Sequence, residues 1–203
     1  MFTDETTVQN KSSNPNRYIF RHPHEKYNQD LVNRTDHVKP TLSDMYWAGI
    51  RLDDHTNLVL MERDSNSPRQ GYSNVSYRKA LDEGFLPLHH RDNIYQHDNS
   101  RVHTAKESTA WFLRHAAFFI EWPPFSPDLN PIENVWNLLK QKLRKMFPYL
   151  GDLNDNAVDR AEFRRCIQAA WKALDQSKIR SIVQSMPARV RAVQRARGWY
   201  TKY

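Results

Sequence analysis

Short apolar segments separated by polar turns occupy most of the first hundred residues, which is the pattern of β-strands. The segments that we expect to form strands are, in chain order, 1–8, 17–21, 45–52, 58–61 and 93–98. Residues 22–44 are polar and rich in His, Asn and Asp, so they predict an excursion over the surface. One helix is expected in this half, over residues 73–86, because its apolar residues fall on one side.

Helical spacing of apolar residues dominates the second half of the chain. The helices that we expect cover 104–115, 131–146, 160–174, 178–184 and 187–197, with Gly198 ending the last one. A buried strand is expected over 117–120, and three prolines within 122–127 exclude regular structure there. The helix that follows them should begin with Asn130 as its N-cap, Pro131 at N1 and Glu133 at N3.

Strands that come first, with helices interleaved and then dominant, predict a mixed α/β fold. The 203 residues suffice for one domain with a core of its own. The single cysteine, Cys166, excludes a disulfide framework within the chain and a zinc site built from several cysteines. No apolar segment is long enough to span a membrane, and the first residues do not resemble a signal peptide, so we expect an intracellular protein without a membrane partner.

Charge is distributed unevenly along the chain. The chain has 30 Lys and Arg against 23 Asp and Glu, a net charge of +7, but residues 137–203 alone hold 15 basic and 5 acidic residues, a net of +10. One interpretation is a set of helices with solvated basic faces; the other is a surface that binds a polyanion, most commonly nucleic acid. The candidate contacts on the last helix are Arg189, Arg191, Arg195 and Arg197.

Three carboxylates stand out by their positions. Asp4 lies early in the first strand, Asp98 ends a central strand, and Glu133 lies in the first turn of a helix. Phosphodiester chemistry commonly uses two divalent cations about 3.5–4 Å apart, held by oxygen ligands from separate elements. Adjacent strands and a helix packed at their ends can supply such ligands.

Each of these carboxylates also has a purely structural interpretation. Glu133 after Asn130 fits a capping box, which satisfies backbone N–H groups at the start of a helix. Asp98 before Asn99 fits a turn at the end of a strand, and Asp4 is by itself unremarkable. The residue types and spacing alone leave both interpretations open.

The segments around the acids resemble mariner-type transposases. Residues 96–105, QHDNSRVHTA, resemble the second catalytic block of this family, and residues 122–136, WPPFSPDLNPIENVW, are similar to the third. The 34 residues between Asp98 and Glu133 match the spacing of one branch of it. Weaker similarities extend the resemblance over essentially the whole chain; they lie at residues 2–5, 46–50, 185–189 and 198–203.

The resemblance implies an RNase H-like fold, a central mixed sheet flanked by helices with a basic helical C-terminal part. It implies that Asp4, Asp98 and Glu133 are catalytic and bind two Mg²⁺ or Mn²⁺ ions. The implied reaction is hydrolytic nicking at transposon ends, followed by attack of a 3′-hydroxyl on target DNA. The resemblance also implies that the partner is DNA, in the form of transposon ends and target DNA, and that the protein acts as a homodimer. A nuclear location follows from the DNA substrate. We expect His103 to be a structural hydrogen-bonding residue below the site and not a ligand.

The chain also departs from the family pattern. Family members carry two helix-turn-helix units ahead of the catalytic domain, whereas Asp4 lies three residues from the start of this sequence. We therefore expect a single catalytic domain over residues 1–203, with a truncated first strand and without the helix-turn-helix region. His97 and the pair Ser100-Arg101 also replace the usual residues of the second block. The alternative function is a non-catalytic transposon relic or repurposed module, which binds nucleic acid or a partner through its basic half.

Overall fold

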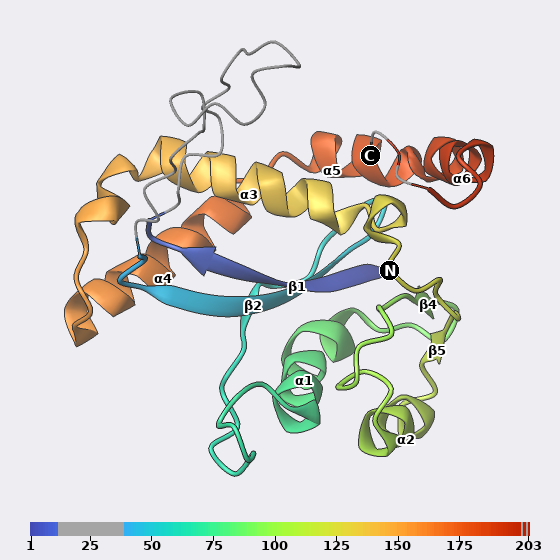
Figure 1. The fold of residues 1–203 in the computed structure, drawn as a ribbon, viewed down its shortest axis with the longest axis horizontal. Helices are drawn as coiled ribbons and strands as arrows, with labels where there is room; N and C mark the ends of the chain where they lie inside the picture. Colours follow the sequence, from blue (N-terminus) through green and yellow to red (C-terminus); the bar gives the residue numbers. More distant parts are fainter. Residues whose placement is uncertain (12–38, 200, 202) are drawn as a thin grey trace, which may run out of the picture.

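A mixed sheet between two groups of helices forms the computed structural model of the chain (Figure 1). The structure describes residues 1–11, 39–199, 201 and 203. Strand β1 (Phe2–Gln9) pairs antiparallel with β2 (Ser43–Ile50) along its whole length. β2 pairs antiparallel in turn with the short strand β3 (Val59–Leu60). All eight residues of β1 thus have a partner in the sheet.

The other edge of β1 meets a second pair of strands. β4 (Ile94–Tyr95) pairs in parallel with β5 (Phe118–Phe119). A parallel bridge between Phe2 and Gln96, with the Gln96 N–H donating to the Met1 carbonyl at 2.9 Å, joins this pair to β1. The order across the sheet is therefore β3-β2-β1-β4-β5, with β1 in the centre.

Side chains of β2 point alternately to the two faces of the sheet, and each face is covered. Tyr46, Ala48 and Ile50 are fully buried on one face, whereas Trp47 is fully buried on the other. This is the period of two expected of a strand that is buried on both sides. The sheet is therefore the middle of three layers.

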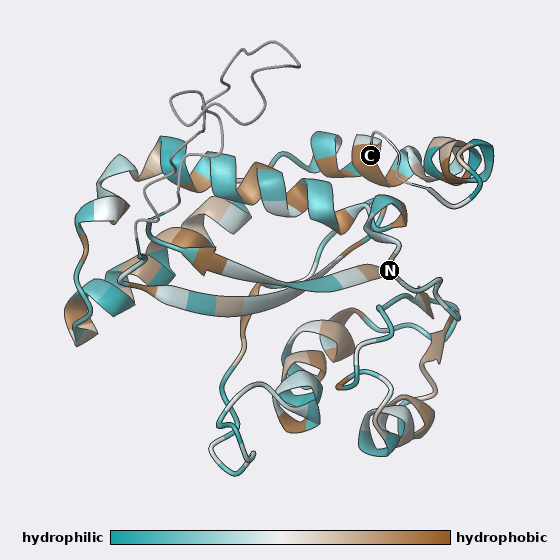
Figure 2. Ribbon diagram, viewed as in Figure 1, coloured by the Kyte–Doolittle hydropathy of each residue, from teal (hydrophilic) through white to brown (hydrophobic). Residues whose placement is uncertain are grey.

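The first face packs against α3 (Ile132–Met146), α4 (Ala157–Lys172) and α5 (Gln176–Gln184). Figure 2 shows hydrophobic (brown) and hydrophilic (teal) residues alternating along α3, as expected of a helix with one apolar face. Its buried residues are Ile132, Val135, Trp136, Leu139 and Leu143. The 3-10 helix η6 (Pro148–Asp152) links α3 to α4, and α6 (Met186–Arg195) follows α5 and contacts η5 (Pro127–Leu129).

The second face packs against α1 (Asn74–Ala80) and α2 (Lys106–Arg114). α1 continues through a π-helical turn, η3 (Leu81–Phe85), into a 3-10 turn, η4 (Leu86–Leu88), so the helix predicted over 73–86 consists of three kinds of turn. Within η3, a Cβ at Gly84 would lie 2.4 Å from the Trp47 ring, so this contact requires glycine.

The mixed α/β class is confirmed, but the segment 117–120 was wrongly predicted to be a buried strand. Phe118 is 65% exposed and Phe119 41% exposed, because β5 lies at the edge of the sheet. The strand predicted over 17–21, and most of the excursion over 22–44, lie outside the described residues. No helix in the described part of the chain has the length and apolar character needed to cross a membrane.

The start of α3 also differs from the expectation. Pro131 precedes its first residue without a side-chain cap, and the Asn130 amide instead donates to the Thr3 carbonyl of β1 at 3.1 Å. Asn130 is therefore used to attach the start of α3 to the central strand, and the capping box expected with Glu133 is not formed. This tertiary contact fixes where the first turn of α3 lies relative to β1.

Candidate active site

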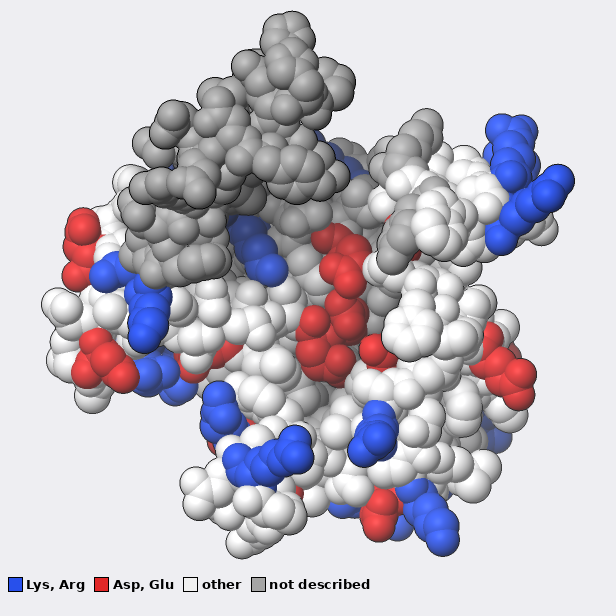
Figure 3. All heavy atoms as spheres, viewed as in Figure 1, with Lys and Arg blue, Asp and Glu red and all other residues white. Residues whose placement is uncertain are grey.

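The three carboxylates singled out from the sequence line a single pocket of about 350 Å³. Two loops, residues 98–100 and residues 122–127, complete its wall. Asn130, which attaches the start of α3 to β1, also lines it. Figure 3 shows carboxylate-bearing residues gathered at the centre of this face of the molecule. Asp4, Asp98 and Glu133 are thus brought together from β1, from the loop after β4 and from α3. Asp98 was predicted to end a strand, but β4 ends three residues before it, at Tyr95.

The sheet register explains why Asp4 and Asp98 meet. Phe2 and Gln96 are paired in parallel, so Asp4, two residues further along β1, lies beside the segment that follows Gln96 and carries Asp98. Trp136, three residues after Glu133 on α3, donates its indole Nε1–H to Asp4 Oδ2 at 3.0 Å. The same helix face therefore orients Asp4 and presents Glu133 to the pocket.

Burial and like charges act on Asp4. Burial raises the pKa of its carboxyl to about 8, the negative charges of Glu5 and Glu133 add to the increase, and the Trp136 hydrogen bond opposes it. The site without a cation thus favours the protonated form of Asp4 near neutral pH.

Asp98 forms an ion pair with His103, which also contacts Glu5 on the opposite face of β1 from Asp4. His103 is buried, with its Nδ1 2.5 Å from Asp98 Oδ1 and its Nε2 3.1 Å from Glu5 Oε1. Burial alone would lower the pKa of His103, but hydrogen bonds to the two carboxylates outweigh it and raise the pKa to about 10. The hydrogen bond from His103 lowers the pKa of Asp98 to about 2. His103 is therefore a hydrogen-bonding support below the site, as expected.

The contacts leave oxygen atoms of the carboxylates for a ligand. His103 and the Ser100 N–H both bind Oδ1 of Asp98, and Trp136 binds Oδ2 of Asp4, so neither contact uses the second oxygen. Glu133 is solvent-exposed, yet partial burial of its carboxyl raises the pKa, and the charge of Lys140 opposes this. Hard oxygen donors of this kind suit Mg²⁺ and Mn²⁺.

The pocket is not closed around an ion. Among the described residues, no three His, Cys, Asp or Glu side chains stand close enough together to hold one. Asp98 is drawn toward His103 and Asp4 toward Trp136, so the three acids share a pocket without forming a finished coordination sphere.

Arg189 is buried, so the prediction that it contacts DNA is wrong. It is 2% exposed, and its guanidinium donates to the Ser185 hydroxyl, the Asp128 carbonyl and the Asn134 side chain at 2.6–2.9 Å. The ring of Tyr203 packs over it at 4.8 Å. These bonds attach α6 to η5 and α3, so the guanidinium is used inside the protein.

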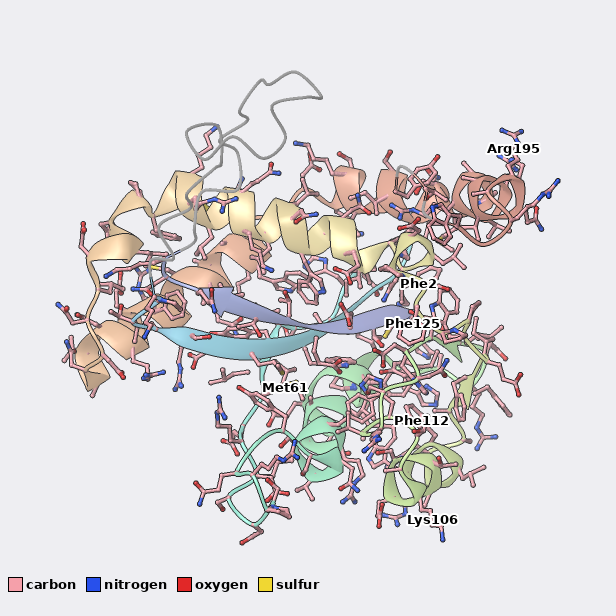
Figure 4. All side chains as sticks on the ribbon, in the orientation of Figure 1. Phe2, Met61, Lys106, Phe112, Phe125 and Arg195 are labelled. Carbon is pink, nitrogen blue, oxygen red and sulfur yellow. The ribbon has the colours of Figure 1, made fainter. Side chains whose placement is uncertain are left out.

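The other three arginines are exposed. Arg191 and Arg195 lie on α6, and Arg197 follows the helix with a positive φ of 52°. Figure 4 shows Arg195 pointing away from the body of the molecule. These side chains therefore keep the exposure that a phosphate contact requires.

Two residues of the site, Glu5 and Trp136, were not selected from the sequence. The sequence nevertheless contains the signal for both residues. Neighbouring residues of a strand face opposite sides of the sheet, and residues three apart on a helix share a face. Asp4 and Glu5 are neighbours on β1, and Glu133 and Trp136 are three apart on α3.

Comparison with known proteins shows what the chain is similar to. A model of the DDE superfamily endonucleases matches residues 89–154, which include Asp98 and Glu133. The chain is 38% identical to the Tc1 transposase of Caenorhabditis elegans over 113 residues and 37% identical to the Tcb1 transposase of Caenorhabditis briggsae over 113 residues. The chain is a homologue of the Tc1/mariner transposases. Each match covers 56% of this chain and 38% of the relative, so this homologue spans less than half of their length.

Solved structures show the same fold. The catalytic domain of Mos1 mariner transposase matches with a TM-score of 0.56 at 16% identity, over 79% of this chain and 76% of that one. The Mos1 strand transfer complex matches with a TM-score of 0.63 at 16% identity, over 98% of this chain and 55% of that one. The Mos1 catalytic domain has also been solved with Mg and with Mn. The homologue has the RNase H-like fold predicted from its sequence.

Replacing His103 with glutamine removes the cation between two carboxylates. We expect the free energy of unfolding at pH 7 to fall by about 1–3 kcal/mol, because two carboxylates lose the buried cation between them. The loss is limited because the Asp98 side chain is 56% exposed to solvent. Since the pKa of His103 is raised from 6.5 to about 10, its contribution is fully present below pH 6.5 and is lost as the pH rises through about 10. Urea unfolding between pH 6 and 10 measures both effects.

The exposed His90 provides a matched control, and His90→Gln should change stability by less than about 0.5 kcal/mol. A His103→Gln variant as stable as the parent at pH 7 would show that the Glu5–His103–Asp98 contact does not hold the site together.

Replacing Asp4 with asparagine should stabilise the protein in EDTA. The folded-state pKa of about 8 lies above the ordinary 3.8, so the folded parent binds more protons than the unfolded chain and loses stability as the pH rises from about 4 to 8. Asp4→Asn removes this loss, and we expect it to be about 1–3 kcal/mol more stable than the parent at pH 8. Thermal unfolding at pH 4, 6 and 8 checks this.

The control is Asp92→Asn at an exposed aspartate outside the pocket, which should follow the parent at every pH. Identical pH dependence in the parent and Asp4→Asn would contradict the assignment of a repelled carboxylate to this position.

Proposed function

We propose that this chain is the catalytic part of a DNA transposase, an endonuclease and strand-transfer domain that acts on phosphodiesters at transposon ends and in target DNA. The observation that carries the proposal is the arrival of Asp4, Asp98 and Glu133 in one pocket from three separate elements. Its support is the endonuclease model, the transposase homologues and the Mos1 strand transfer complex among the structural neighbours. The proposed catalytic domain extends over residues 1–203.

We further propose that the three carboxylates bind two Mg²⁺ or Mn²⁺ ions. Such ions, when bound, activate the attacking oxygen and stabilise the leaving one. The donor set supports this, because each of Asp4 and Asp98 is anchored through one oxygen and keeps the other. A cation would also offset the burial and the like charges that together raise the pKa of Asp4.

The chain's own residues position these ligands. His103 keeps Asp98 ionised and fixes it through Oδ1, while Trp136 orients Asp4 from α3. The Asn99 amide donates to the Trp122 carbonyl at 2.6 Å and joins the two loops that form the pocket wall. The proposed reaction needs no protein nucleophile, because water or a 3′-hydroxyl attacks the phosphorus.

Contacts to DNA outside the pocket are assigned to the basic second half of the chain. Arg191, Arg195 and Arg197 are exposed and support this role. Arg189 is buried and is not included in the proposed contact surface. A nuclear location follows from the DNA substrate, and a homodimer from the resemblance to the family; both are part of the proposal.

Nicking of supercoiled plasmid in Mn²⁺ tests the proposed activity. We expect the parent to convert supercoiled into open-circular DNA and EDTA to stop it. Asp98→Ala and Glu133→Gln should each reduce the rate at least about 100-fold, since even residues behind a metal ligand contribute about 10- to 100-fold. Asp92→Ala, an exposed acid outside the pocket, is the matched control and should cut like the parent.

Two outcomes would contradict the proposal. If Asp98→Ala and Glu133→Gln cut as fast as the parent, the assignment of the acids is wrong. If the parent binds DNA but does not nick it in Mg²⁺ or Mn²⁺, the alternative of a non-catalytic nucleic-acid-binding module replaces the endonuclease.

A further inference from the structure

Phe125 is a fully exposed aromatic residue at the edge of the acid pocket, the pocket lined by the three carboxylates. Its side chain is 100% exposed, and its backbone has a positive φ of 52°, a conformation that bulky side chains rarely adopt. Figure 4 shows Phe125 close to Phe2, near the N-terminal end of β1. Phe125 also lines the pocket that contains Asp4, Asp98 and Glu133. Neither the exposed ring nor the left-handed backbone stabilises the fold, and such features tend to cluster at functional sites.

The loop on both sides of Phe125 is firmly held. Pro123 and Pro124 precede it and restrict the backbone, and the Ser126 hydroxyl donates to the Pro124 carbonyl at 3.1 Å. Trp122 packs edge-on against Phe2 with ring centroids 6.4 Å apart and accepts the hydrogen bond from Asn99. The backbone that carries Phe125 is therefore restrained on both sides, and its ring extends into solvent from this loop.

Phe125 also separates two hollows. It lines the pocket of the three acids, and it lines a second hollow of about 170 Å³ together with Val193, Gly198 and Trp199 from the C-terminal segment. A group that covers the Phe125 ring would thus lie directly beside the carboxylates. The ring offers this group an apolar, uncharged surface at the edge of an acidic site.

The chemistry of that group follows from the proposed function, on which this inference rests. A DNA strand beside the acids brings phosphates, which carboxylates repel, and bases, whose faces stack on aromatic rings without using charge. We propose that Phe125 stacks on an unpaired nucleobase next to the phosphodiester at which the acids act. The base must be unpaired or turned out of the duplex, because inside a duplex both of its faces are covered. Stacking of this kind tolerates every base.

Fluorescence of 2-aminopurine in a DNA duplex with a short 3′ overhang tests this stacking. The probe base is placed in turn at each overhang position, and binding of the full chain is followed in EDTA, so that cutting does not interfere. We expect the parent to quench the probe at one position. Phe125→Ala should lose this quenching and bind about tenfold more weakly, which is the effect of one stacked base.

Substitutions at the same position separate stacking from apolar contact. Phe125→Trp should keep the quenching and the affinity, whereas Phe125→Leu, apolar but without a ring, should behave like Phe125→Ala. Phe118→Ala removes another exposed phenyl ring, 65% exposed on β5 and outside the pocket, and should bind and quench like the parent. Equal quenching by the parent, Phe125→Ala and Phe125→Leu would overturn the proposal, as would a parent that quenches at no position.

The nicking assay in Mn²⁺ distinguishes this result from failure of the proposed function. A parent that nicks plasmid while its quenching is independent of Phe125 retains the endonuclease function and loses the stacking residue. A parent whose quenching depends on Phe125 but which does not nick retains the stacking residue as part of a DNA-binding site and loses the endonuclease function.

Discussion

The alternation of side chains along β1 is the constraint on which the site depends. Asp4 points to the face covered by α3, where Trp136 binds it, and Glu5 points to the opposite face, where it binds His103. His103 in turn holds Asp98 in the loop after β4. One central strand thus positions two of the three acids, Asp4 directly and Asp98 through the buried His103. A shift of one residue in the register of β1 would turn Asp4 and Glu5 each to the opposite face of the sheet.

The acids are placed in different electrostatic environments. His103 keeps Asp98 ionised, while burial and the charges of Glu5 and Glu133 favour protonation of Asp4. A fold selected only for stability would avoid such a repelled carboxylate, since burying a charge without a partner is costly. A pair of groups whose environments move their pKa values apart is typical of functional sites.

Local sequence was sufficient for the fold class, because the class depends on the periodicity of short segments. The segments that resemble transposases also contain the three acids that line one pocket in the structure. Local sequence was not sufficient where segments far apart in the chain meet. Arg189 becomes internal because Asp128 and Asn134 surround it, and Asn130 binds the Thr3 carbonyl of β1. The exposure of β5 likewise depends on which strand ends the sheet. Periodicity within one segment contains no information about such partners.

The central claim is that Asp4, Asp98 and Glu133 form one site for divalent cations, and location of bound Mn²⁺ by anomalous X-ray scattering tests it most directly. Crystals of the chain grown with Mn²⁺ should show anomalous peaks in the pocket, within coordination distance of these carboxylates. The same crystals of Asp98→Ala should lose at least one peak. Ordered Mn²⁺ found only elsewhere on the protein, with the pocket empty, would contradict the claim.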